Sequence, residues 1–227
     1  MQYLIYAGIL VAAYLFGSIP FGLIVVKLMT GKDIRTIASG RTGGTNAMRA
    51  AGPWAGILTA VFDILKAAVT VWIAQAITPN VWVHALTPIA AILGHNYSIF
   101  LMERSSEGRI RLRGGAGGAA AGGGAFGLWP PAGFILVPFG LLVWFGTGYA
   151  SVTTLSIGLA AILIFGVRAA LGLGPWEYIL YGIFAEILLI WALLPNIKRL
   201  KEGTERQHGL PAFLAQRREA KSRNDKT

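Results

Sequence analysis

Three short stretches of the chain combine side chains that suit the binding of phosphate. The first reads SGRTGGTNAMR, from Ser39 to Arg49, and its paired glycines allow a tight backbone whose N–H groups can point at an anion. Ser39, Thr45 and Asn46 add short hydrogen-bonding groups, and Arg49 adds a guanidinium that can bind two phosphate oxygens at once. This composition indicates an anion site, while a glycine-rich loop before a helix can also be only a turn and a cap.

The second stretch reads GHNYSIFL, from Gly94 to Leu101, and is followed by GGAGG from Gly114. His95 could exchange a proton near neutral pH or hydrogen-bond a substrate. Its alternative role is to anchor the chain at the membrane interface or to satisfy a backbone carbonyl. The N–H groups of Gly114 and Gly115 could receive a phosphate, as glycine-rich loops do elsewhere.

The third stretch reads PNIKRLKEGTERQHG, from Pro195 to Gly209, and comes directly after an apolar run. Asn196, Arg199 and Glu205 could converge on one surface there. The alternative is that its basic residues are only the positive flank of a membrane span.

Other chemistries are excluded by residue type and placement. The chain has no cysteine, so it has no disulfide, thiolate nucleophile or iron–sulfur site. Its three histidines, at positions 84, 95 and 208, lack metal-ligand spacing, and we expect neither a metal nor another cofactor. Although the net charge is +10, the clustering of the basic residues in alternate loops indicates membrane orientation, and we expect no nucleic-acid partner.

The composition indicates that the elements carrying these stretches lie in a membrane. Hydrophobic residues make up 55% of the 227 residues and charged residues only 13%, against roughly 25% charged in soluble proteins. We therefore predict an all-α, polytopic membrane protein with about seven spanning helices. Their expected ranges are 3–26, interrupted by Gly17, Ser18 and Pro20, then 54–77, 81–101, a glycine-rich fourth after 114, 131–145, 151–166 and 178–194.

The distribution of charge predicts the orientation of these spans. Of 20 basic residues, five lie between Lys27 and Arg49, four between Arg104 and Arg113, and nine between Lys198 and Lys226. Seven crossings put all three groups on one side, which the positive-inside rule identifies as cytoplasmic. The N-terminus would then lie outside, and the phosphate-suited stretches would face the cytoplasm in a multi-pass protein of the cell membrane.

Spacing within the apolar runs gives further expectations. Asp63 and Lys66 share one helical face, which predicts a structural ion pair, whereas Glu186 has no partner nearby in the sequence. The small residues of the fourth segment predict close helix packing. We expect one membrane domain over residues 1–210 and a basic cytoplasmic tail over 211–227.

Taken in order, the motifs resemble those of the bacterial acyl-phosphate:glycerol-3-phosphate acyltransferases, the PlsY family of integral membrane enzymes. The resemblance rests on YLFGSIPFG from Tyr14, SGRTGGTNAMRAAG from Ser39, DILK from Asp63, GHNYSIFL, and NIKRLKEGTE from Asn196. It implies transfer of an acyl group from acyl phosphate to glycerol-3-phosphate, giving 1-acylglycerol-3-phosphate and phosphate without a cofactor.

The resemblance also suggests roles for individual residues. His95, Asn196 and Glu205 would form the catalytic group, with His95 or the departing phosphate taking the proton of the attacking hydroxyl. Phosphate-binding groups would come from each motif, namely Ser39, Arg41, Thr45, Asn46, Arg49, Arg113, Gly114, Gly115 and Arg199. The partners would be the two substrates and membrane lipids, and we expect a monomer.

The chain departs from the family pattern at three positions. Arg41 stands where the family usually has Asn, Ala116 replaces a phosphate-binding Lys, and Leu193 replaces a His. Arg41 or the arginines at 109, 111 and 113 could restore the lost positive charge, although a guanidinium binds phosphate differently from an ammonium.

These departures leave two alternative functions open. The chain could be a catalytically degenerate relative that binds acyl phosphate or lipid without turnover. It could also be a small anion transporter that uses the same basic motifs, although no internal repeat is evident in its sequence.

Overall fold

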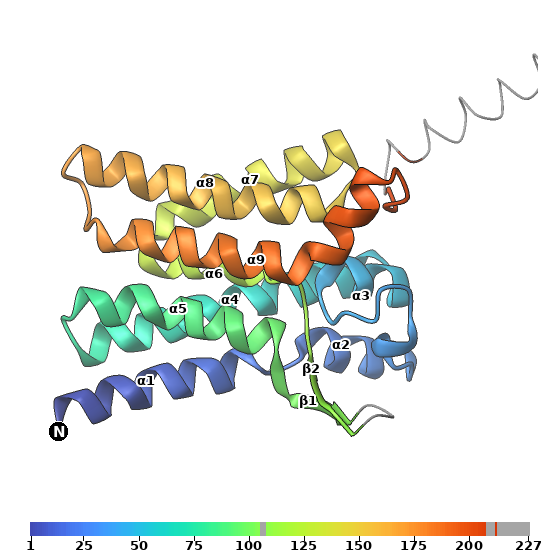
Figure 1. Cartoon of the computed structure of the whole chain (residues 1–227), viewed down its shortest axis with the longest axis horizontal. Coiled ribbons are helices and arrows are strands. Elements are labelled where there is room, and N and C mark those ends of the chain that lie inside the picture. The colour runs from blue at the N-terminus through green and yellow to red at the C-terminus, as the bar shows by residue number, and fades with distance from the viewer. Residues whose placement is uncertain (105–107, 208–211, 213–227) are drawn as a thin grey trace, which may run out of the picture.

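The protein is a bundle of helices that run back and forth along a common direction (Figure 1). The computed structural model describes residues 1–104, 108–207 and 212. Its longer helices are α1 (Gln2–Gly17), α4 (Pro53–Ile77), α5 (Val81–Asn96), α6 (Gly118–Leu128), α7 (Pro130–Thr147), α8 (Ala150–Ala170) and α9 (Glu177–Lys201). Shorter elements gather at one end: α2 (Phe21–Thr30), the 3-10 turn η1 (Ile34–Thr36), α3 (Gly44–Ala51), and the strands β1 (Ser98–Arg104) and β2 (Ile110–Arg113).

Helix length and hydropathy confirm a multi-pass membrane protein. Among the described residues, five segments are long and apolar enough to cross a bilayer: Gln2–Thr30, which joins α1 and α2, and the helices α4, α7, α8 and α9. Helix α5 has 16 residues and α6 has 11, fewer than the roughly 20 that a straight crossing requires. The number of seven spans and the orientation therefore stay predictions.

The expectation of an all-α chain is wrong after α5. The predicted span 81–101 ends as a helix at Asn96, and Ser98–Arg104 forms a strand that pairs antiparallel with Ile110–Arg113. The run IFLM in this strand is apolar enough to read as more helix. Instead, Ser98 and Met102 pair with Arg113 and Leu112 of the second strand, and the register shifts between these two pairs.

The predicted break in the first apolar segment is confirmed. Helix α1 ends at Gly17 and α2 begins at Phe21, with Pro20 between them unable to donate a backbone hydrogen bond. The carbonyl of Ile19 is left outside both helices and accepts a hydrogen bond from Lys66 Nζ at 3.0 Å.

Small residues let α6 lie against its neighbours at backbone distance, as predicted. A Cβ placed on Gly123 would lie 2.1 Å from the carbonyl oxygen of Ile64 on α4, and one on Gly127 would lie 2.7 Å from Val71 Cβ. On another face, Gly124 meets Pro88 of α5 equally closely. Helix α6 thus has no room for side chains where α4 and α5 cross it.

We expect Gly123→Ala to destabilise the protein by about 1–3 kcal/mol, the usual cost of adding a methyl group to a close-packed interior. Gly146→Ala on α7 is the matched control, because a Cβ there meets nothing within 4 Å. Unfolding of both variants in detergent would be compared with the parent protein. Equal stability of the two variants would contradict the close packing of α6 on α4.

Candidate active site

All three phosphate-suited stretches lie at the same end of the bundle (Figure 1). The first stretch forms helix α3 and the loop that precedes it. The second connects α5 to the hairpin and to α6, and the third contains the C-terminal turns of α9. Helix α9 extends to Lys201, beyond the predicted end at 194, so Asn196 and Arg199 lie on its last turns. Basic side chains in this last turn interact favourably with the helix dipole.

A buried charged cluster joins α4 to α5 below this end. The predicted pair is confirmed, since Lys66 Nζ lies 2.8 Å from Asp63 Oδ1 and both side chains are 1% exposed. His95 Nδ1 lies 3.4 Å from the same oxygen, and its Nε2 faces Gly115, where a Cβ would lie only 1.9 Å away. Asp63 therefore holds both the lysine and the imidazole, a contact that spacing alone did not reveal.

We expect Asp63→Asn to destabilise the protein by about 3–5 kcal/mol, because it leaves the Lys66 ammonium buried without its counter-charge. The double variant Asp63→Leu/Lys66→Met should recover most of that loss, since it removes both charges. Unfolding in detergent measures both. A double variant as unstable as the single one would contradict a simple charge-pairing role.

A second network fixes Arg41 against α9. Its Nη2 donates to the carbonyl of Ala192 and, at 3.2 Å, to Asn196 Oδ1. Asn196 Nδ2 in turn donates to Glu205 Oε1 at 2.7 Å, and Arg199 Nε donates to Glu205 Oε2 at 3.0 Å. The predicted convergence of Asn196, Arg199 and Glu205 is thus confirmed, and Arg41 joins it from another part of the chain.

Arg41 keeps donor capacity to spare. Its Nη1 is buried and has no hydrogen-bond partner among the described residues. Burial lowers the pKa of its guanidinium, and the nearby Arg199 lowers it further, while Glu205 opposes both. The guanidinium of arginine is effectively always protonated in proteins, so Arg41 stays charged at neutral pH.

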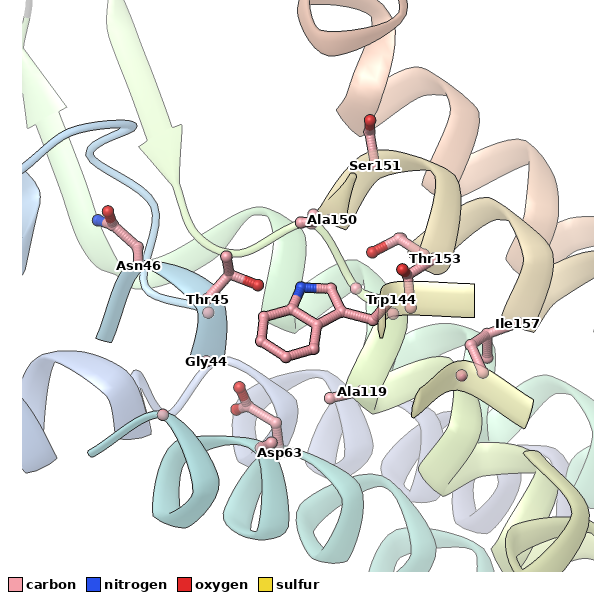
Figure 2. Close-up of a pocket in the computed structure, with 18 of the residues that line it drawn as sticks. Gly44, Thr45, Asn46, Asp63, Ala119, Trp144, Ala150, Ser151, Thr153 and Ile157 are labelled. Carbon is pink, nitrogen blue, oxygen red and sulfur yellow. The ribbon is translucent and has the colours of Figure 1, made fainter. Parts of the chain in front are cut away.

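Asn46 organises the loop that carries Arg41. Its Nδ2 lies 2.9–3.2 Å from the carbonyl oxygens of Ile34, Ile37 and Arg41. The amide therefore closes the loop on itself and points away from the centre of the adjacent cavity (Figure 2).

The first cavity, of about 360 Å³, opens among α3, α4, α7, α8 and the end of α9. Eight predicted site residues line it: Ser39, Arg41, Thr45, Asn46, Arg49, His95, Asn196 and Glu205. Asp63 also reaches it from below (Figure 2). Burial lowers the pKa of Arg49, Arg206 lowers it further and Glu205 raises it, so the polar end of this cavity holds two arginines.

The other wall of the first cavity is apolar and was not predicted. Leu136, Leu141 and Trp144 of α7 and Ile157 of α8 line it, and the Trp144 indole crosses the opening beside Thr45 (Figure 2). In the sequence these residues look like any others in a membrane span. Ala116 and Leu193, two of the positions that depart from the family pattern, lie on this cavity too.

A second cavity, of about 820 Å³, lies between the hairpin and α9. Arg113, Gly114 and Gly115 line this cavity and not the first. Arg113 Nε is 2.8 Å from Glu103 Oε2 on the neighbouring strand. Ser39 and Arg41 line both cavities, so Arg41 lies where the two meet.

The remaining predicted residues lie outside both cavities. Arg199 contacts the first cavity only through Glu205, and Glu186 lines neither cavity.

In the described part of the chain, no group of three or more His, Asp or Glu side chains could hold a metal ion. His208 and the predicted tail 211–227, apart from residue 212, lie outside the described residues.

A family model and curated relatives match this chain over most of its length. The family model is described as glycerol-3-phosphate acyltransferase and matches residues 7–203. A protein of that name from Thermus thermophilus is 38% identical over 200 residues, which cover 88% of this chain and 94% of the relative. One from Rubrobacter xylanophilus is 32% identical over 86% of this chain and 92% of its own length.

Two crystal structures share the fold. One is PlsY (YgiH), described as an integral membrane glycerol 3-phosphate acyltransferase, in its glycerol 3-phosphate form, with a TM-score of 0.78 and 30% identity. The other is the same enzyme in its lysophosphatidic acid form, with a TM-score of 0.77 and 29% identity. Each match covers 92% of this chain and 98% of that protein.

Proposed function

This chain belongs to the glycerol-3-phosphate acyltransferase family, and we propose that it transfers an acyl group from acyl phosphate to glycerol-3-phosphate for phospholipid synthesis. One observation carries the proposal: the first cavity joins Arg41 and Arg49 at one end to the apolar wall around Trp144 at the other. That combination suits a donor with a charged phosphate and a long alkyl chain.

The reaction needs little chemical activation. A hydroxyl oxygen of glycerol-3-phosphate attacks the carbonyl carbon of the acyl phosphate and forms the new ester bond. The bond from that carbon to the phosphate oxygen breaks, and inorganic phosphate leaves with the bonding electrons. Because phosphate is a good leaving group, positioning of the two substrates and stabilisation of negative charge supply most of the rate.

His95 accepts the proton of the attacking hydroxyl in this proposal. With its Nδ1 beside Asp63 at 3.4 Å, the tautomer protonated at Nδ1 leaves the Nε2 lone pair for the substrate. Departing phosphate is the alternative acceptor. His95→Gln distinguishes them, since it removes the imidazole base and leaves the phosphate route intact.

In this proposal Arg41 supplies the phosphate-binding cation that the family pattern has at the position of Ala116. Ala116 and Leu193, which replace the family Lys and His, lie on the same cavity as Arg41, and the free Nη1 of Arg41 is available for a phosphate oxygen. Arg49, Ser39 and Thr45 add further contacts.

The other predicted residues act around this centre. Asn196, Glu205 and Arg199 are positioning residues, because their hydrogen bonds hold Arg41 in place. Asn46 positions the loop, while Gly114 and Gly115 let the backbone approach His95 and its neighbour closely. Arg113 contributes positive charge beside Glu103.

We place the site at the cytoplasmic face of a monomer with seven crossings. The three basic stretches support this side through the positive-inside rule. Helices α5 and α6 would complete the count as short crossings, which is feasible where neighbouring helices rather than lipid surround them.

The proposal is tested with the purified chain in lipid, palmitoyl phosphate and glycerol-3-phosphate, following released phosphate and lysophosphatidate by mass spectrometry. Both products should appear in equal amounts. Binding of palmitoyl phosphate without either product would identify a degenerate relative and refute turnover. Palmitoyl-CoA in a parallel reaction tests the identity of the donor.

Arg41→Gln should lower kcat/KM for palmitoyl phosphate by about tenfold to a hundredfold, which corresponds to the roughly 1.5–3 kcal/mol contributed by a hydrogen bond to a charged group. Lys198→Gln removes one charge from an exposed position that contacts only Glu202 among the ion pairs of the described residues, and it should leave the rate unchanged. Thermal unfolding of both variants checks their folding. Full activity of a folded Arg41→Gln variant would exclude Arg41 as the replacement cation.

A further inference from the structure

We propose that the second cavity binds the phosphate headgroup of an anionic membrane phospholipid, at a site that adjoins the substrate cavity at Ser39 and Arg41. This inference does not depend on the proposed reaction. It rests on three features of the described residues: an amphipathic hairpin, a basic cavity that adjoins it, and an aromatic rim that faces outward.

The hairpin has one face tied to the protein and one face exposed. On the tied face, Glu103 pairs with Arg35 at 3.1 Å and with Arg113 at 2.8 Å. On the other face, Met102 stands opposite Leu112. Ile110 shares that face, since alternate residues of a strand point the same way.

The exposed face carries three apolar side chains together with Arg104, which stands opposite Ile110, a composition that suits the surface of a bilayer. Met102 is 55% exposed, Ile110 63% and Leu112 38%. Transfer of these apolar side chains from water into lipid would be favourable. The hairpin follows α5 directly and runs across the helix direction at the motif end of the bundle (Figure 1). In this proposal the strand pair lies along the membrane plane, with its apolar side chains toward the lipid.

The second cavity adjoins the hairpin, from which Leu112 also lines it, and three cations contribute to its lining. Arg41, Arg111 and Arg113 contribute to its wall, and among the described residues that line it there is no carboxylate. Basic pockets at the cytoplasmic membrane surface bind anionic lipid headgroups. Arg41 is shared with the first cavity and Arg113 is paired with Glu103 at 2.8 Å, so Arg111 supplies the positive charge that belongs to this cavity alone.

The rim favours a lipid over a soluble phosphate. Trp191 of α9 lines the cavity and is 67% exposed on the outside of the bundle, and Tyr97 lines it from the end of α5. Trp and Tyr prefer the membrane interface because their rings are amphipathic. A phospholipid would place its phosphate among the arginines and its chains beside Trp191, whereas a soluble phosphate would leave this rim uncovered.

The test uses the full chain reconstituted in bilayers that contain spin-labelled phosphatidylglycerol or phosphatidylcholine. Electron paramagnetic resonance measures the fraction of each lipid that the protein immobilises. We expect preference for phosphatidylglycerol, and Arg111→Gln should reduce it by about fivefold, given about 1 kcal/mol per basic residue near an anionic surface. Arg109→Gln, which removes the same charge from the hairpin at a position outside both cavities, should change it much less.

Three results would overturn the proposal. The first is equal immobilisation of the two lipids by the parent protein, and the second is an equal loss of preference in Arg111→Gln and Arg109→Gln. The third is displacement of phosphatidylglycerol by millimolar glycerol-3-phosphate, which would assign the cavity to a soluble phosphate. The lipid measurement needs no turnover, so an inactive protein would still be informative.

The depth of the hairpin provides a second, independent measurement. Because the chain has no cysteine, Met102→Cys and Arg111→Cys each create a single thiol for an environment-sensitive fluorophore. In liposomes, a lipid-borne quencher should quench the label at 102 more than the label at 111, and iodide in water should do the reverse. Equal quenching by iodide at both positions would show that the apolar face does not enter the bilayer.

Discussion

The positive charge of Lys66 is buried inside the bundle, and much of the surrounding architecture serves to neutralise it. An ammonium removed from water is costly unless it is paired and hydrogen-bonded. Asp63 supplies the counter-charge, the carbonyl of Ile19 supplies an acceptor, and the ring of Phe21 lies 5.6 Å from the ammonium. The break between α1 and α2 makes this contact possible, because in an unbroken helix the Ile19 carbonyl would accept a hydrogen bond from the next turn. The Asp63 carboxylate that pairs with Lys66 also contacts His95 and so orients its imidazole.

A second set of charges organises the motif end of the bundle. Arg41 comes from a loop in the first quarter of the chain, and its hydrogen-bond partners Ala192 and Asn196 lie more than 150 positions later. The loop and the end of α9 thus close on each other through one guanidinium. Held in this way, Arg41 is a fixed cation that lines both cavities.

Hydropathy and residue spacing predicted much of this arrangement, because a bilayer constrains the length and the apolar character of the helices that cross it. The spans centred on α4, α7, α8 and α9 follow from segment length, and the Asp63–Lys66 pair follows from helical periodicity. The hairpin was missed, because the residues of β1 read as more apolar helix. The contact of Arg41 with α9 was also missed, since long-range pairing leaves no local signal. Trp144 could not be distinguished from a lipid-facing residue.

The glycine-rich helix α6 has a consequence for how the chain enters the membrane. It has 11 residues, of which eight are buried, and its partners include α8 and α9, which are synthesised after it. Such a helix offers too little apolar surface to partition into lipid by itself. Its contacts with α4 and α5 can form first, whereas those with α8 and α9 form only after these two helices have been made, so the packing around α6 is completed last.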